Sequence, residues 1–159
     1  MNFLARLSGY LDAKGIRYSH SIHAPAQTAL SVAKAERMPA HELAKTVVYF
    51  GDNGYGLAVV PADEMVDLQE VRVLLGLSFI RLAEESELLE LFPDCQLGAM
   101  PPLGTFHDLP VAIDAQIARR RFIAFTAGTH RDVIRMSYDD FQRLVRPVEG
   151  IFATSEALA

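Results

Sequence analysis

The sequence predicts a single α+β domain built around a mixed β-sheet, and three observations lead to this fold class. The chain has 159 residues, of which half are hydrophobic and 22% are charged, a length and composition typical of one globular domain. Segments in which apolar residues recur at helical spacing alternate with short segments rich in β-forming residues. A clear antiparallel hairpin stands among them, so the sheet should be mixed rather than purely parallel. We expect one domain over residues 1–159, with a core at about residues 16–145.

The individual elements follow from apolar spacing, caps and breakers along the chain. An amphipathic helix is expected over residues 3–14, with Asn2 as its cap and Gly15 just past its end. A second helix begins after Thr28 and ends before Pro39. The other expected helices cover residues 68–75, 84–92 and 138–145, and the expected strands cover 16–21, 44–50, 57–60, 78–83, 110–113, 122–127 and 132–136. The tail after Pro147 should be loosely held.

The strand over residues 44–50 carries the first candidate site residue, Lys45. The run is almost continuously apolar, which favours a strand covered on both faces. A lysine at the entrance of such a strand holds its ammonium in a fixed place, where it can meet a phosphate, a carboxylate or a polarised carbonyl. The alternative is that Lys45 snorkels to solvent at the strand end, and its position alone favours neither interpretation. The pair Asn53-Gly54 then turns the chain back into the strand over residues 57–60.

Two segments that contain glycine supply further candidates. The segment Leu97–Gly104 has two glycines and two prolines, which predicts a stiff loop with an exposed backbone that could form a binding wall or a plain connector. His130 follows the apolar strand over residues 122–127, a good place for a donor aimed into a cleft, although a lone histidine is more often structural. The candidates in these segments are Gly98, Ala99, Met100, Pro101, Pro102, Gly128 and His130.

Charge is distributed unevenly along the chain. The net charge of -5 argues against a general nucleic-acid coat protein. Nine acids stand against two arginines between Asp63 and Asp94, whereas seven arginines stand against three acids between Arg119 and Arg146. A polyanion could therefore approach in one orientation, although an uneven solvated surface explains the pattern equally well. The candidate contacts are Arg119, Arg120, Arg121 and Arg131.

Several common site motifs are absent from the sequence. It has no Gly-x-Ser-x-Gly elbow, Walker loop or Cys-x-x-Cys pair. His20 and His23 lack further ligands nearby in the sequence, and the single cysteine, Cys95, follows the acid Asp94 rather than a base. No apolar run approaches the ~18 residues of a membrane span, and the first residues do not resemble a signal peptide. We therefore expect no metal, no cofactor, no membrane contact and a cytoplasmic location.

Four sequence blocks, in order and at matching spacing, resemble the YbaK-like family of aminoacyl-tRNA deacylases, which also occurs as the editing insertion of bacterial prolyl-tRNA synthetases. The blocks are Ala44–Val48, Val59–Asp63, Gly98–Gly104 and Phe125–His130, and the resemblance extends from about His20 to Leu144. It implies a free-standing domain with a curled mixed sheet surrounded by helices. It also implies hydrolysis of the ester of a mischarged tRNA.

The resemblance assigns roles to particular residues. The essential lysine of the family falls on Lys45, its Gly-x-x-x-Pro loop on residues 98–102, and a histidine important in several members on His130. Family members are thought to use a positioned water and the terminal ribose hydroxyl of the tRNA, without a protein nucleophile or a metal. Alanine-specific members look to carry asparagine where this chain has Thr46, so the amino acid removed stays open, with a small one favoured by a compact pocket.

Two functions are compatible with these observations. The first is a trans-editing hydrolase that acts on the acceptor end of an aminoacyl-tRNA, such as a small amino acid on tRNA(Pro), with Thr46, Gly128 and residues 99–102 lining the substrate site. An aminoacyl-tRNA synthetase that delivers the substrate is a further partner left open, as is the oligomeric state. The second is a noncatalytic module that binds tRNA or a nucleotide, in which Lys45 and the arginines hold phosphate.

Overall fold

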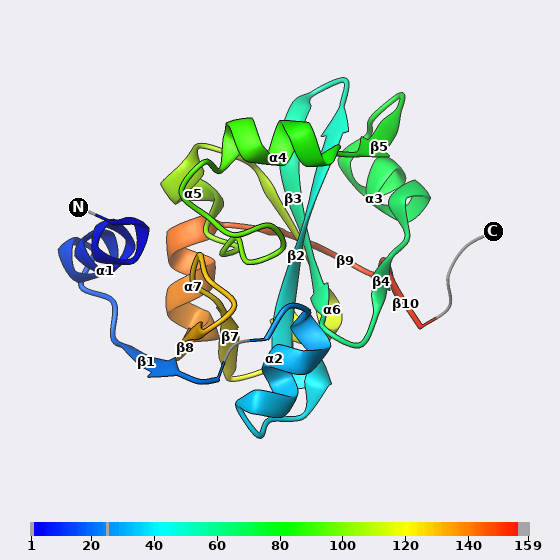
Figure 1. Cartoon of the computed structure of the whole chain (residues 1–159). Coiled ribbons are helices and arrows are strands. Elements are labelled where there is room, and N and C mark those ends of the chain that lie inside the picture. The colour runs from blue at the N-terminus through cyan, green and yellow to red at the C-terminus, as the bar shows by residue number, and fades with distance from the viewer. Residues whose placement is uncertain (1, 25, 156–159) are drawn as a thin grey trace.

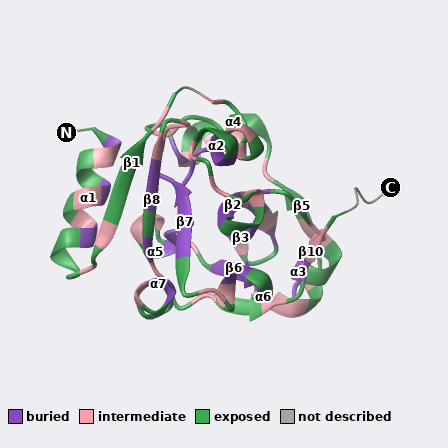
Figure 2. Ribbon diagram, turned by 90° about the horizontal axis from the view of Figure 1, so that it is seen from below, coloured by how far each residue is buried: buried purple, intermediate pink, exposed green. Residues whose placement is uncertain are grey.

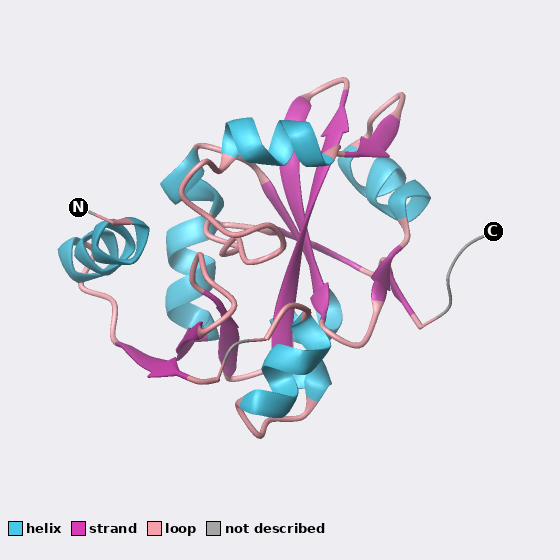
Figure 3. Cartoon of the chain, viewed as in Figure 1, coloured by secondary structure: helices cyan, strands magenta, loops and turns pink. Residues whose placement is uncertain are grey.

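The structure, a computed structural model, describes residues 2–24 and 26–155. Figure 1 and Figure 3 show a twisted sheet with helices around it. The helices are α1 (Phe3–Ala13), α2 (Ala29–Ala35), the 3-10 helix η1 (Ala40–Glu42), α3 (Leu68–Leu75), α4 (Glu85–Leu91), α5 (Gly104–His107), α6 (Ala115–Ala118) and α7 (Tyr138–Val145). The strands are β1 (Tyr18–Ile22), β2 (Leu43–Gly51), β3 (Gly54–Pro61), β4 (Met65–Val66), β5 (Ile80–Leu82), β6 (Val111–Asp114), β7 (Phe122–Thr126), β8 (Asp132–Ser137), β9 (Val148–Gly150) and β10 (Ala153–Thr154).

The main sheet is mixed, as the sequence predicts. Within the described residues its strand order is β1-β8-β7-β2-β3-β6-β9, with β5 paired to the far end of β2. The β2–β3 hairpin, β1–β8, β7–β8 and β2–β5 pairs are antiparallel, whereas β2–β7, β3–β6 and β6–β9 are parallel. The pairing confirms the α+β fold class. In this part of the chain, every helix is too short or too polar to cross a membrane.

The two faces of β2 are buried by different helices. Ala44 and Val48 face the largest hydrophobic cluster, to which α1 and α7 contribute. Leu43 and Tyr49 face the opposite side, where α2 and α3 pack. Because successive strand residues point to opposite faces, Lys45 shares the side of Leu43 and Thr46 the side of Ala44. Figure 2 shows buried residues gathered along the central strands, while β1 at the edge is exposed.

Local caps explain where the helices begin. The Asn2 side chain accepts a hydrogen bond from the N–H of Ala5, and the Thr28 and Ser31 side chains form a capping box at α2. Asp67 caps α3. These side chains satisfy N–H groups that have no partner inside the helix, which is why the sequence located these helix starts correctly.

Two sequence-based expectations are wrong. Most of the loop before α5 is not exposed: Ala99 to Gly104 are all buried, and only Leu97 and Gly98 of the candidate wall lie on the surface. The tail after Pro147 is not loosely held, because β9 pairs with β6 and Phe152 is buried beneath α3. Together with Phe3, Leu7 and Leu11 of α1, Phe152 shows that residues on both sides of 16–145 pack into the interior.

Asp114 anchors the C-terminal tail. Its side chain is buried, and one carboxyl oxygen accepts hydrogen bonds from the N–H groups of Phe152 at 2.9 Å and Ala153 at 2.8 Å. The other oxygen caps α6 through the N–H of Gln116 at 2.9 Å. Three donors therefore depend on this one side chain.

We expect Asp114→Ala to lower the free energy of unfolding by about 2–3 kcal/mol, because buried donors are left without acceptors. Urea denaturation measures this change, with Asp12→Ala at an exposed position of α1 as the control. An effect no larger than that of the control would show that the tail is held by other contacts.

Candidate active site

Lys45 lies on the face of the sheet against which α2 and α3 pack, called the outer face below, and it is level with the end of β7. The parallel register pairs Leu43 with Ala124 and Ala44 with Phe125, so its continuation sets Lys45 beside Thr126. Side chains in register on neighbouring strands share a face. The segment that carries His130 begins directly after Thr126, at the same end of the sheet. The backbone of Lys45 therefore lies at the end of β7 from which the His130 turn leaves.

The Lys45 side chain is held rather than free. It is partly buried, and its Nζ donates to the backbone oxygen of Glu64 at 2.5 Å. Burial lowers the pKa of Lys45 below its ordinary value of 10.5, and the nearby Asp63 carboxylate partly offsets this. Folding with a charged Lys45 consequently costs free energy at neutral pH, and this cost declines as the pH rises through the lowered pKa toward 10.5. Residues 63–64 thus fix the ammonium in place.

The structure places Thr46 away from Lys45. Its side chain is buried on the inner face of β2, and its Oγ1 has no hydrogen-bond partner among the described residues. Since Ala44 and Val48 on either side of it face the main core, the hydroxyl does not share the surface of Lys45. A role in substrate binding stays a prediction, and it would have to pass through the backbone or through packing.

The loop over residues 96–99 is joined to the β7–β8 turn by backbone hydrogen bonds. The Gly128 N–H donates to the oxygen of Ala99, and the Gln96 N–H donates to the oxygen of Gly128, both at 2.8 Å. The Gln96 side chain also accepts from the N–H of His130 at 2.8 Å. Two segments about thirty residues apart in the sequence therefore form one unit that includes Gly98 and His130.

His130 lies directly against Gly98. A Cβ atom added at Gly98 would come within 3.5 Å of the His130 Cε1 atom. His130 Nε2 is 2.7 Å from the oxygen of Leu97, and because a carbonyl oxygen only accepts, Nε2 carries the proton in the neutral ring. This leaves Nδ1 as a buried acceptor that has no partner within the described part of the chain. The ring therefore holds an unused acceptor that solvent does not reach in this structure.

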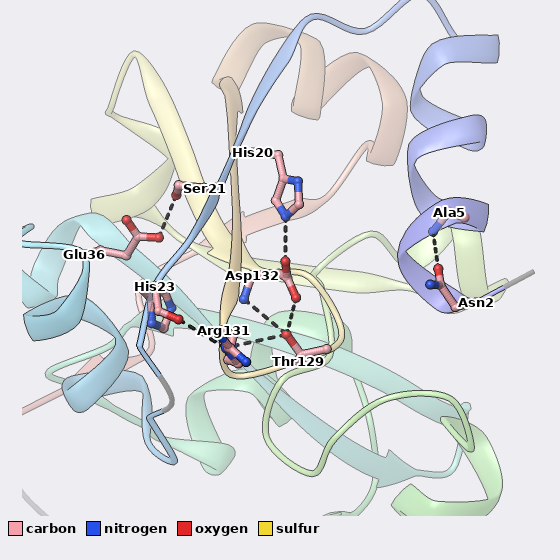
Figure 4. A network of polar contacts seen from close by, with 9 residues as sticks. All are labelled: Asn2, Ala5, His20, Ser21, His23, Glu36, Thr129, Arg131 and Asp132. Carbon is pink, nitrogen blue, oxygen red and sulfur yellow. Dashed lines mark hydrogen bonds and ion pairs between the residues drawn. The ribbon is translucent and has the colours of Figure 1, made fainter.

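A polar network that the sequence analysis missed fixes the turn (Figure 4). Thr129 Oγ1 donates to Asp132 at 2.5 Å and accepts from the N–H groups of Arg131 and Asp132. The other carboxyl oxygen of Asp132 lies 2.7 Å from His20 Nε2 on β1. The Thr-x-x-Asp spacing is a local signal for such a turn, but the pairing with His20 depends on strand order. His20 therefore supports the turn.

The arginines predicted to meet a polyanion border a groove on the outer face. The groove has a volume of about 360 Å³ and lies beyond η1 at the start of β7. Arg120 is 3.5 Å from Glu42, and the Arg135 guanidinium lies 4.1 Å from the centre of the Phe122 ring. Arg131 lies elsewhere, exposed on the turn beside His130. The lining residues are Met38, Glu42, Arg119, Arg120, Arg121, Phe122, Ala124 and Arg135.

Cys95 lacks the features of an activated nucleophile. Burial, reinforced by the neighbouring Asp94 carboxylate, raises the pKa of its thiol to about 12. A thiol with such a pKa is almost entirely protonated at neutral pH and is a weak nucleophile. The candidate site instead offers a cation, exposed backbone at Gly98 and a histidine acceptor.

Comparison with known proteins identifies the family. The sequence profile of the aminoacyl-tRNA editing domain matches residues 23–144. The chain therefore belongs to this family, the YbaK-like editing domains that its four sequence blocks indicate. Over 78 residues it is 30% identical to the proline--tRNA ligase of Thermosipho africanus (strain TCF52B), a match that covers 49% of this chain and only 14% of the ligase.

Solved structures share the whole fold. A protein proposed to be a trans-editing enzyme for prolyl-tRNA synthetase has a TM-score of 0.81 and 23% identity, over 97% of this chain and 98% of that one. The hypothetical protein APE2540 has a TM-score of 0.84 and 19% identity, over 94% of this chain and 99% of that one. These likenesses confirm the fold, while the roles of individual site residues rest on the geometry.

The contact between Gly98 and His130 leads to a prediction. Gly98 has a φ of +82°, so Gly98→Val adds backbone strain of about 1–3 kcal/mol and places a branched side chain against the histidine. We expect kcat/KM for deacylation of a misacylated tRNA to fall by about 10²-fold, because the ring is displaced.

Gly76→Val is the matched control, because Gly76 also has a positive φ of +67° but has open space around it at the end of α3. Thermal melts and kinetics of both variants separate strain from site geometry. Equal losses of activity in the two variants would mean that Leu97–Gly104 is only a connector.

Proposed function

We propose that the protein hydrolyses the ester bond of a mischarged aminoacyl-tRNA and so removes a wrong amino acid. The proposal is supported by the contact between Gly98 and His130 and by the strand register that sets the Lys45 backbone beside the end of β7, in a chain that belongs to the editing family. Substrates are a small amino acid on tRNA(Pro) or on a similar tRNA. The acceptor end of the tRNA is the part bound at the site.

In the proposed reaction, water adds to the ester carbonyl and the bond to the ribose oxygen then breaks. The released ribose oxygen takes up a proton, and the amino acid leaves as a carboxylate with loss of one proton. Lys45 Nζ has three protons, of which one is used on Glu64. The others are available to the carbonyl oxygen as negative charge develops on it, which is the step that placed donors accelerate most.

His130 and the loop position the substrate in this scheme. The Nδ1 atom of His130, which is buried and has no partner among the described residues, would accept a hydrogen bond from the attacking water or from the terminal ribose hydroxyl once substrate binding opens the space beside it. No protein side chain forms a bond to the substrate, which agrees with the high pKa of Cys95. An ester has a reasonable leaving group, so orientation and charge stabilisation can supply most of the rate.

Burial of the loop supports the preference for a small amino acid. Residues 99–104 pack into the interior, so Gly98, which they support, cannot withdraw without disrupting the core. A rigid wall rejects a larger side chain sterically, whereas a smaller one enters. The proposed substrate class is therefore a tRNA that carries a small, mismatched amino acid.

The role of Lys45 is tested by Lys45→Met, which keeps an unbranched side chain and removes the charge. We expect kcat for deacylation to fall by about 10²–10³-fold, the loss typical of one oxyanion donor. The melting temperature should stay within about 4 °C of the parent, because removal of a partly buried charge offsets the lost hydrogen bond.

Lys34→Met, on the exposed side of α2, is the control and should leave the rate unchanged. RNA binding distinguishes the rival function: a binding module would lose affinity in a salt-dependent way. Hydrolysis by Lys45→Met at the parental rate would remove Lys45 from the mechanism.

The arginine groove is tested by replacing Arg119, Arg120 and Arg121 with Ser. If the groove receives the tRNA backbone, KM for charged tRNA rises while kcat at saturation is kept, the pattern of lost uniform binding. The dependence of affinity on salt also becomes less steep, because fewer counterions are released.

Arg143→Ser combined with Arg146→Ser is the control, since both residues are exposed and lie outside this groove. Circular dichroism checks the fold first, because arginine stems also pack against neighbours. An unchanged KM and salt slope in the folded triple variant would place the tRNA elsewhere.

A further inference from the structure

Helix α1 lies outside the residues that match the family, yet it is firmly docked. The family match begins at residue 23, whereas α1 ends at Ala13. Phe3, Leu7 and Leu11 are buried in the main hydrophobic cluster, with exposed fractions of 7%, 0% and 0%. Figure 1 shows α1 beside α5 and the segment that leads to it. The helix thus lies next to the segment that follows the loop of the site.

Three side chains of α1 contact residues that lie before and after that loop. Arg6 forms an ion pair with Asp94, just before the loop. Tyr10 Oη lies 2.8 Å from Thr105 Oγ1, just after it. The Phe3 ring stacks on His107, with 6.0 Å between ring centres and 9° between ring planes, and burial lowers the pKa of His107 to about 4, so this ring is neutral at physiological pH.

Phe3 also touches the backbone of the turn that carries His130. A Cβ atom added at Gly128 would lie 2.3 Å from Phe3 Cδ1 and 2.6 Å from Cε1. The phenyl ring therefore rests directly on the Gly128 main chain, in the space that a side chain would fill. Gly128 has a φ of +92°, a conformation that glycine adopts without strain. This explains why glycine stands at position 128 without assigning it to substrate contact.

We propose that α1 braces the candidate active site and that Phe3 is a positioning residue for His130. The Gly128 N–H donates to the oxygen of Ala99, and the Gly128 oxygen accepts from the N–H of Gln96. Because the Phe3 ring packs on the Gly128 backbone, it stabilises the hydrogen bonds that join the turn to the loop. Arg6 and Tyr10 fix the two ends of the same loop. The helix thereby sets the distance between Gly98 and His130. The catalytic consequence of this brace rests on the proposed function, whereas the brace itself does not.

Amide hydrogen exchange, measured by NMR on the full chain, tests the brace without an activity assay. In Phe3→Ala we expect the N–H groups of Gln96, Gly128 and His130 to exchange at least about tenfold faster, while those of the β2–β3 hairpin change less, because opening is local. Leu11→Ala is the matched control: it truncates another buried apolar residue of the same helix, and its effect should be spread over the core.

Phe3→Leu keeps an apolar side chain and serves if Phe3→Ala does not fold. It should show the same selective loss of protection, to a smaller extent. The proposal would be overturned if a folded Phe3 variant kept the parental protection of the turn. It would also be overturned if Leu11→Ala lost this protection to the same extent.

Kinetics give the second readout. Phe3→Ala should lower kcat for deacylation by about tenfold and leave KM within about twofold, because the substrate still binds but His130 is misplaced. Phe3→Leu should restore part of kcat, and Leu11→Ala should leave kcat unchanged at a temperature where the variant is folded. Equal kcat values for Phe3→Ala and the parent would overturn the catalytic consequence. If the parent protein hydrolyses no ester, the proposed function fails and the exchange data alone decide the brace.

Discussion

The hydrogen bonds between Gly128 and the loop over residues 96–99 are the contacts on which the candidate site depends. They join a loop that follows α4 to the turn between β7 and β8. Gly98 of the loop and His130 of the turn therefore become neighbours, although they are far apart in the sequence. The parallel pairing of β2 with β7 then brings Lys45 level with the start of this turn. Because pairing, loop and turn are all required, the site exists only in the complete fold.

Much of the fold could be predicted because its signals are local. Helix caps at Asn2 and Thr28, the Asn53-Gly54 turn and the apolar strand of Lys45 each depend on residues close in sequence. The candidate residues Lys45, Gly98 and His130 were also found this way, with the family resemblance supplying their order. Local patterns and the family resemblance are therefore enough to propose candidate residues, although not to show how the fold arranges them.

The remainder could not be predicted because it depends on contacts between distant segments. The tail is held because the Asp114 side chain accepts hydrogen bonds from the N–H groups of Phe152 and Ala153. The turn network follows from the pairing of β1 with β8, which brings His20 to Asp132. Thr46 illustrates a third case: the predicted substrate site included both Lys45 and Thr46, but strand alternation turns the two side chains to opposite faces.

The proposed function requires this arrangement to hydrolyse an ester rather than only to bind RNA. The most direct measurement is single-turnover deacylation by the unmodified protein of a panel of tRNAs charged with different amino acids, compared with spontaneous hydrolysis. We expect at least one tRNA carrying a small, mismatched amino acid to lose it well above the spontaneous rate, while larger amino acids are retained. Binding of the charged tRNAs with no hydrolysis across the panel would contradict it.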